Sequence, residues 1–378
     1  MRKFALSSNM FHLTDEEVEQ LEAQAATGDP EACYKWGRYL YCVRPEHDSV
    51  SKAAVQFMMA KAEGVVDAAV AISLMWYNGD FGMVDRTKGK QFLLEALEKE
   101  NEFAAFVYLR KLIYGHHGFE VDTDKALTML KALVEKSDNP NFYYLLGVVY
   151  QIQSNYAESL PWLEKAYAEG VGESAMDLAL ARSGGFTADG NFADYDVYLK
   201  ELDQLSAESQ DGFATYLYAA LFASDYDKLE DEAQKAEAHE AIKAEVENAL
   251  AWGCGEAALF LGDAYYDATC GFEEDLARAF SYYAKGAILG SADCYERMYE
   301  MVVAEEIKGN YSQDFADNCV LEAARLGSQD MMRQVVAIYK AGRLTDFAAE
   351  IEQYYLPEVE AMDDDDMPDD DGRYDAYA

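Results

Sequence analysis

The stretch from Gly28 to Gly64 reads GDPEACYKWGRYLYCVRPEHDSVSKAAVQFMMAKAEG and decides the fold. It contains two runs with the apolar spacing of helices, a loop between them and a glycine at each end. The same interval separates Gly64 from Glu100, and variants of the pattern recur along most of the chain. The recurring starting residues are Gly28, Gly64, Glu100, Gly253, Gly290 and Gly327. Self-similarity of this kind predicts an array of helix pairs that pack on their neighbours.

The first half of each repeat has an apolar stripe at every fourth residue, which places the stripe on one face of a helix. The position four residues after the start is mostly small, as in Ala32, Ala68, Ala104 and Ala257. The next two positions are large: Trp36, Ile72, Tyr108 and Leu261, then Leu40, Trp76, Leu112 and Tyr265. Small residues let neighbouring helices approach closely, and the large ones fill the layer between them.

The second half of each repeat carries a matching helical stripe before the next starting residue. Its large members are Phe57, Leu93, Tyr283 and Val320, and its small members are Ala60, Ala96, Gly286 and Ala323. Glycine-containing loops join the two helices. Asp85 and Asp122 follow these loops at the position expected for the N-cap of the second helix.

These features resemble the Sel1-like repeat, a relative of the tetratricopeptide repeat. Asp122-Thr123-Asp124-Lys125-Ala126 and Lys52-Ala53 match the opening of its second helix, whereas Gly89 stands where Ala is usual. Leu146-Gly147-x-x-Tyr150 and Leu261-Gly262-x-x-Tyr265 match the tetratricopeptide form. The resemblance implies an all-α solenoid of about eight to nine antiparallel helix pairs in a right-handed superhelix, with the first helices lining the concave side.

The pattern divides the chain into five parts. Residues 1–27 hold a capping helix, which begins with the capping box of Thr14 and Glu17. Residues 28–170 and 253–356 are repeat arrays. Residues 171–252 form two degenerate repeats or a functional insertion, with a loop around Ser183-Gly184-Gly185. Residues 357–378 form a disordered acidic tail after Pro357.

The chain is strongly acidic, with 31 Lys and Arg against 71 Asp and Glu and a formal charge of −40. Such a surface disfavours nucleic acid and anionic membrane as partners and suits a basic protein. The tail has three interpretations: it solubilises the chain, docks a basic partner, or weakly collects divalent cations. The tail lacks the glycine and the ligand spacing of a calcium loop, which argues against the third.

The sequence contains no specific catalytic motif, so we expect no enzyme, cofactor or metal. The six cysteines are unevenly spaced and are interpreted as reduced core thiols. His116 and His117 lie in a repeat loop, where exposure to solvent is favoured over metal binding. No signal peptide or membrane span is evident, which indicates a cytoplasmic protein.

A strip beside the core stripe of the first helices is the predicted partner site, although its members could instead offset local acidic charge or contact a neighbouring repeat. It consists of Lys35, Arg38, Leu74, Val107, Arg110, Phe260, Asp263, Arg297 and Glu300.

Two functional hypotheses follow from these observations. The first is a non-catalytic scaffold or adaptor that binds a protein or peptide through this strip. The alternative is an acidic inhibitor or immunity-type neutraliser that imitates the charge of nucleic acid. Charge mimicry predicts a steep salt dependence of binding, and groove recognition predicts a shallow one. The sequence identifies neither the partner nor the oligomeric state.

Overall fold

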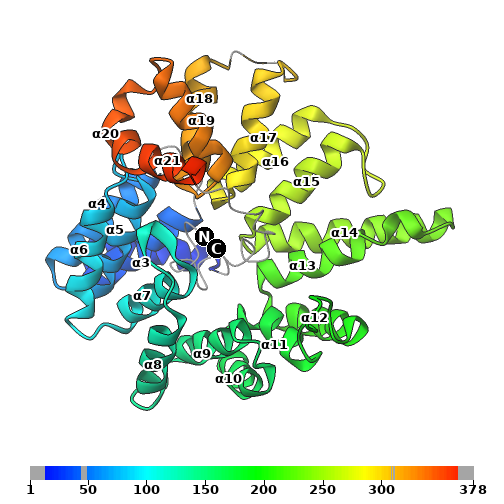
Figure 1. The fold of residues 1–378 in the computed structure, drawn as a ribbon, viewed down its shortest axis with the longest axis horizontal. Helices are drawn as coiled ribbons and strands as arrows, with labels where there is room; N and C mark the ends of the chain where they lie inside the picture. The colour runs from blue at the N-terminus through cyan, green and yellow to red at the C-terminus, as the bar shows by residue number, and fades with distance from the viewer. Residues whose placement is uncertain (1–12, 44–48, 308, 310, 365–378) are drawn as a thin grey trace. The chain divides into compact units, whose positions relative to one another are not determined.

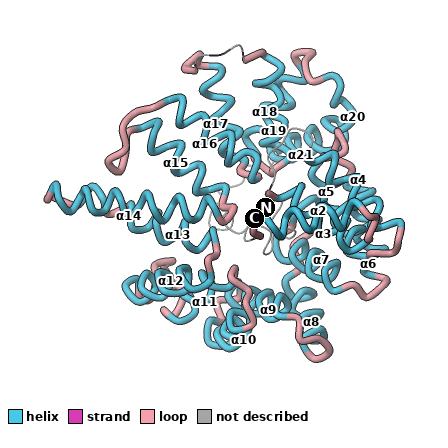
Figure 2. Tube along the Cα trace, turned by 180° about the vertical axis from the view of Figure 1, so that it is seen from behind, coloured by secondary structure: helices cyan, strands magenta, loops and turns pink. Residues whose placement is uncertain are grey.

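The computed structural model describes residues 13–43, 49–307, 309 and 311–364. In this part of the chain the backbone forms helices joined by short loops, and its one bridge of strand type is an isolated contact between Phe186 and Phe192 (Figures 1 and 2). The predicted all-α class is therefore confirmed for the residues described.

The chain divides into two compact units, which are described separately. Unit 1 comprises Met1–Asn101, Leu261–Asp267 and Glu274–Ala378, and unit 2 comprises Glu102–Phe260 and Ala268–Glu273. The helices of unit 1 are α2 (Asp15–Ala26), α3 (Pro30–Cys42), α4 (Ser49–Ala62), α5 (Val66–Asn78), α6 (Arg86–Leu97), α16 (Leu276–Leu289), α17 (Ala292–Val303), α18 (Gln313–Arg325), α19 (Gln329–Lys340), α20 (Ala348–Glu350) and α21 (Leu356–Asp364). Those of unit 2 are α7 (Glu102–Tyr114), α8 (Thr123–Val134), α9 (Pro140–Ile152), α10 (Tyr156–Ala168), α11 (Ser174–Arg182), α12 (Tyr195–Ser209), α13 (Gly212–Ala223) and α14 (Glu232–Ala251). Helix α15 (Gly255–Asp267) belongs partly to each.

Consecutive helices pair along the chain, as the repeat pattern predicts. Over the described residues, α3 to α18 form eight such pairs, and α19 is followed by an irregular segment that ends in α21. The segment 171–252 supplies the pairs α11–α12 and α13–α14, and the predicted loop around Ser183 lies between α11 and α12. The capping box is present, because Thr14 accepts from the backbone N–H of Glu17 and the Glu17 carboxylate accepts from that of Thr14.

The Asp residue before the second helix of a pair has the predicted capping role. Asp122 accepts a hydrogen bond from the N–H of Lys125 at 2.9 Å, and the Lys125 ammonium lies 5.4 Å from the centre of the Tyr108 ring on the preceding helix. Asp85 and Lys88, and Asp275 and Arg278, repeat this arrangement, with the cation over Trp76 and Tyr265. The short Asp-x-x-Lys or Asp-x-x-Arg motif thus caps one helix and holds it against the other.

Glycine inside the first helix allows the two helices of a pair to approach closely. A Cβ on Gly147 would lie 2.6 Å from the Leu163 side chain of α10, and one on Gly262 would lie 2.2 Å from the ring of Tyr283. Gly89 has the same role from the second helix, α6, where a Cβ would lie 2.9 Å from the Tyr77 ring of α5, which explains why it replaces the usual Ala. The Leu-Gly-x-x-Tyr motif is therefore a packing requirement.

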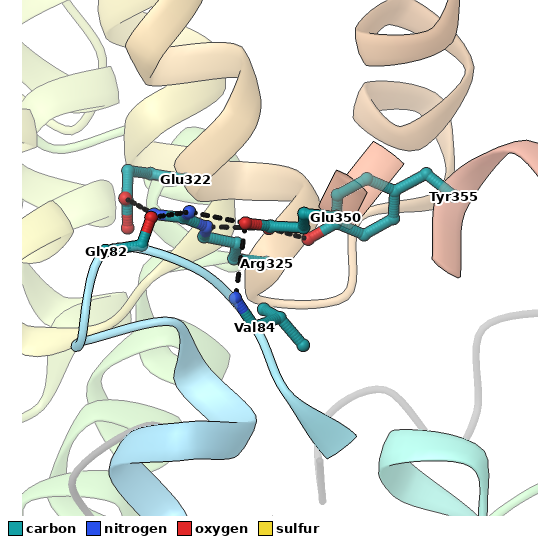
Figure 3. Close-up of polar contacts among 6 residues, drawn as sticks. All are labelled: Gly82, Val84, Glu322, Arg325, Glu350 and Tyr355. Carbon is teal, nitrogen blue, oxygen red and sulfur yellow. Dashed lines mark hydrogen bonds and ion pairs between the residues drawn. The ribbon is translucent and has the colours of Figure 1, made fainter. Parts of the chain in front are cut away.

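Within unit 1, the loop after α5 packs against the C-terminal helices (Figure 3). The Glu350 carboxylate is fully buried and receives two hydrogen bonds from Arg325, at 2.9 and 2.6 Å. It also accepts from the Tyr355 hydroxyl and from the N–H of Val84, while Arg325 donates to the carbonyl of Gly82. Val84 joins the apolar cluster formed by α18, α19 and the final helices. One satisfied ion pair therefore joins segments more than 240 residues apart in the sequence.

The C-terminal boundary differs from the prediction. Pro357 was expected to end the ordered chain, but it lies in the first turn of α21, where a proline needs no intrahelical donor. Val359 is buried there, and Glu358 pairs with Arg86, whose guanidinium also stacks on the Tyr354 ring. The rest of the predicted acidic tail, residues 365–378, lies outside the described residues.

The cysteines are free thiols, and His117 is half-buried rather than exposed. Cys33, Cys42, Cys254, Cys294 and Cys319 are buried, and Cys270 is half-buried. His117 Nδ1 lies 2.7 Å from the Lys111 ammonium. Among the described residues, no group of three His, Cys, Asp or Glu side chains could hold a metal ion, and no helix is both long and apolar enough to cross a membrane.

Replacement of Gly147 by Ala tests the close approach of the helices in a pair. We expect the variant to lose about 1–3 kcal/mol of unfolding free energy through overpacking against Leu163, although Ala is the better helix former. In a Leu163→Ala background the same change should cost less, because the clashing methyl groups are gone. Denaturant unfolding of all four proteins measures this; a Gly147→Ala protein more stable than the wild type would contradict it.

Replacement of Glu350 by Ala tests the contact shown in Figure 3. It leaves the buried Arg325 guanidinium without its main counter-ion, so we expect a loss of about 3–5 kcal/mol. The control is Asp330→Ala, which breaks an exposed pair with Arg333 and should cost less than about 1 kcal/mol. Equal, small losses for both variants in chemical denaturation would show that the Glu350 contact does not stabilise the fold.

Candidate binding site

The candidate site lies on the first helices of the pairs in unit 2. Helix α7 contacts α9, and α9 contacts α11, so these helices form one layer although other helices separate them in sequence. Small residues such as Ala104 and Ala175 are fully buried in this layer and allow the close spacing. Side chains from successive repeats therefore meet on this layer.

Arg110 of α7 is placed in this layer by two aromatic rings from its own helix. Its guanidinium carbon lies 5.6 Å from the centres of the Phe106 and Tyr114 rings, one turn before and one turn after it. The residue is only 8% exposed. Its Nη1 lies 3.7 Å from Oε2 of Glu173, a residue that directly precedes α11. This is an ion-pair distance that is too long for a hydrogen bond.

Two carboxylates complete the site, and we call Arg110, Tyr144, Glu173 and Asp177 the acidic cluster. Asp177 on α11 is 1% exposed, and the Tyr144 hydroxyl on α9 hydrogen-bonds to its carboxylate. Oδ2 of Asp177 and Oε2 of Glu173 are both buried and have no hydrogen-bond partner in the part of the chain that the structure describes. The Glu173 side chain as a whole is 23% exposed, so it lies at the edge of the cluster. Buried carboxylate oxygens without donors are uncommon in proteins.

Burial changes the protonation of both carboxylates. It raises the pKa of Glu173 to about 8, an effect that Arg110 opposes and that the nearby Asp211 and Asp177 carboxylates reinforce. Burial also raises the pKa of Asp177 to about 7, against the Tyr144 hydrogen bond and the Arg110 charge. The pKa of Tyr114 rises to about 12 for the same reason. Near neutral pH the cluster therefore holds protons that an exposed carboxylate would have released.

The acidic cluster can accept hydrogen bonds and exchange protons near pH 7. When ionised, its two unused carboxylate oxygens are acceptors, so they suit a ligand that brings donors or positive charge. The carboxylates are too few for a metal centre of the usual kind. Its chemistry is therefore that of an acceptor site for a cationic group.

The residues of the predicted strip belong to both units, and each unit is described by itself. In unit 1, Lys35 is exposed, Leu74 is half-buried, and Arg38 is half-buried with its guanidinium 5.7 Å from the Tyr34 ring. Asp263, Arg297 and Glu300 meet, because Arg297 pairs with both carboxylates at 3.2 Å.

In unit 2, Phe260 is half-buried, Val107 is buried and Arg110 belongs to the acidic cluster. Val107 and Arg110 therefore do not present the open basic and apolar surface that the spacing predicted.

Tyr144, Glu173 and Asp177 were missing from the prediction. Because the repeat alignment weakens in residues 171–252, the residues of helix α11 could not be matched to positions of the repeat. One signal was present in the sequence: Asp177 is the single charged residue in the run Ala175-Met176-Asp177-Leu178-Ala179, which otherwise reads as a buried helix. A carboxylate in such a run must be paired, protonated or available to a ligand.

Comparison with known proteins found no matching family model and no matching curated protein. Among solved structures, a Sel1 repeat protein from Oxalobacter formigenes is similar, with 19% identity and a TM-score of 0.42 over 85% of this chain and 89% of that one. A protective antigen of uropathogenic Escherichia coli that displays an SLR fold is also similar, with 18% identity and a TM-score of 0.39 over 91% and 72%.

The helix pairs, their Asp caps and their close-packed glycines define this chain as a helical-repeat protein. Its repeats resemble those of the Sel1-like type.

Asp177→Asn tests the protonation of the cluster. Because the pKa of Asp177 is raised from 3.8 to about 7 on folding, the folded state binds more protons, and stability falls as pH rises from about 4 through 7. The isosteric amide has no charge to bury. We expect it to raise the unfolding free energy by at least about 1 kcal/mol at pH 8 and to change it little at pH 4.

Thermal melting of the wild type and Asp177→Asn across this pH range measures the effect. Glu169→Gln, at an exposed position of the same unit, is the control and should show no such trend. A stability difference between wild type and Asp177→Asn that does not vary with pH would contradict the raised pKa.

Proposed function

We propose that this protein is a non-catalytic scaffold that binds a protein or peptide through the first helices of its repeats. The observation that carries the proposal is the pair of buried carboxylate oxygens on Glu173 and Asp177, for which the described residues supply no hydrogen-bond donor. A fold that leaves acceptors unsatisfied loses stability, so such groups are commonly kept for a ligand. The ligand would supply the missing donors.

The residues that flank these oxygens support a binding role over a catalytic one. A carboxyl group with a pKa near 7 also suits a general acid, but that role requires a substrate atom within hydrogen-bond reach. Asp177 is almost completely covered, and its neighbours are Tyr144 and Arg110, which serve as a hydrogen-bond donor and a counter-charge. The cluster lacks Ser, Cys or His as a nucleophile, so recognition is the role that its residue types suit best.

The predicted strip in unit 1 supports a second contact with the partner. Lys35 and Arg38 lie on α3 and are exposed and half-buried, in a chain whose net charge is −40. Basic groups in such a chain can pair with acidic residues of a partner and exclude a partner that is basic throughout. The proposed partner therefore carries both signs of charge.

An acidic neutraliser of a basic protein is the competing proposal, and the net charge favours it. A partner held by the whole acidic surface would lose affinity steeply as salt rises, because exposed charges are screened. A partner held by buried acceptors would lose little affinity as the salt concentration rises. Binding measured at about 0.05 and 0.5 M salt separates the two, since the Debye length shrinks about threefold between them.

Charge reversal at Lys35 and Arg38 tests the scaffold proposal. The Lys35→Glu/Arg38→Glu protein should capture its partner from native lysate at least about tenfold less efficiently, a difference of about 1.4 kcal/mol. The matched control is Lys90→Glu/Lys99→Glu, which makes the same charge change at exposed positions on or just after α6. Quantitative mass spectrometry measures how much partner each double variant captures. Equal capture by the two would exclude Lys35 and Arg38 as a contact with the partner.

A further inference from the structure

We propose that the acidic cluster of unit 2 receives one cationic side chain of the partner, the guanidinium of an arginine or the ammonium of a lysine. This inference rests on the proposed scaffold function and names the chemistry of its ligand. It depends on four features of the cluster: the position of the unused acceptors, the local charge, the surrounding rings and the coupling to protons.

The unused acceptors lie at two depths. Glu173 is at the edge, with its side chain 23% exposed, and Asp177 lies behind it at 1%. Oε2 and Oδ2 lack hydrogen-bond partners although both are buried. A linear cationic side chain could meet Glu173 first and Asp177 at its tip. A guanidinium has five N–H donors and an ammonium three, enough to satisfy both oxygens.

The local charge favours a cation even though Arg110 is present. With Glu173, Asp177 and the neighbouring Asp211 ionised, three negative charges face the single positive charge of Arg110, which leaves a balance of −2. Asp211 is already used as the cap of α13, where it accepts from the N–H of Ala214 at 2.8 Å. The remaining negative charge lies on Glu173 and Asp177. An anionic ligand would increase the repulsion, whereas a cation would relieve it.

The rings around the cluster suit a flat or compact cation. Phe106 and Tyr114 hold Arg110 between them at 5.6 Å, so its guanidinium is fixed by its own helix. Tyr144, which is 5% exposed, adds an aromatic side chain from α9 beside Asp177. Aromatic faces attract cations most strongly where water is excluded. The combination of carboxylates and rings is typical of sites for Arg and Lys side chains.

Binding should release protons. The titratable and charged groups that face the two carboxylates are Arg110 and Tyr114 on α7, Tyr144 on α9, Tyr198 on α12 and Asp211 before α13. Of these groups only Arg110 opposes the rise in both carboxylate pKa values. A second cation would lower both values further, so an occupied cluster holds fewer protons. Affinity for the cation therefore increases as pH rises through 7 and 8.

The test uses small probes and the full-length protein. Nα-acetyl-arginine amide and Nα-acetyl-lysine amide are titrated into the protein by calorimetry at pH 6 and pH 8.5. We expect at least one of them to bind, with roughly tenfold higher affinity at pH 8.5, and with proton release seen as a dependence on the ionisation enthalpy of the buffer. Nα-acetyl-citrulline amide, the uncharged analogue of the arginine probe, should not bind.

Two substitutions locate the site. Asp177→Asn and Glu173→Gln keep the shape of the side chain and should each reduce the affinity of the charged probe at least about tenfold at pH 8.5. Glu169→Gln, an exposed carboxylate of the same unit, is the control and should bind as the wild type does. The arginine and lysine probes compared directly show which cation the cluster prefers.

The outcomes separate this inference from the proposed function. No binding of either charged probe, or equal binding by Asp177→Asn and the wild type, overturns the cation site while partner capture through Lys35 and Arg38 can still hold. Binding of the probes without any effect of Glu173→Gln or Asp177→Asn on partner capture supports the cation site and contradicts its place in the scaffold function. Equal binding of the citrulline probe excludes charge recognition.

Discussion

The close approach of paired helices, which glycine allows in α3–α4, α5–α6, α9–α10 and α15–α16, is the constraint on which the rest of this structure depends. Gly147 and Gly262 leave room for a Leu or a Tyr of the next helix where a methyl group would not fit. Buried alanines then lie at equivalent positions of neighbouring repeats, and apolar contacts continue from one repeat to the next within each unit. Because every pair packs mainly on its neighbours, stability accumulates along the chain rather than around one centre.

Polar contacts between the helices add to this packing. The Asp-x-x-Lys motifs hold the two helices of a pair together, since the carboxylate caps one helix and the cation lies over a ring of the other. Glu350 and Arg325 join more distant segments of unit 1, and both Glu350 oxygens and all three Arg325 nitrogens form hydrogen bonds there. The acidic cluster of unit 2 is the opposite case, because two of its acceptors are unused. The Glu350 ion pair is therefore satisfied within the fold, whereas the acidic cluster keeps two acceptors for the proposed ligand.

The sequence predicted the repeat architecture because helix periodicity and capping are local. Ala32, Asp122 and Gly262 each act through neighbours within one or two repeats, so their roles could be inferred from spacing alone. The contact of Val84 with Glu350 could not be inferred, since nothing local links residues so far apart. Spacing placed Arg110 beside the core stripe, but its ion pair with Glu173 could not be inferred, because Glu173 lies in a segment that the repeat alignment did not resolve.

The fold buries one carboxylate oxygen of Asp177 and one of Glu173 without a hydrogen-bond donor among the described residues, and the ionisation of Asp177 reports this burial most directly. Carboxyl ¹³C NMR of the full-length protein, with Asp177→Asn to assign the signal, gives its titration curve. The structure predicts a midpoint near pH 7, far above the ordinary 3.8 of an aspartate. A midpoint close to 3.8 would show that the carboxylate is solvated or fully paired, and would contradict the account of this site.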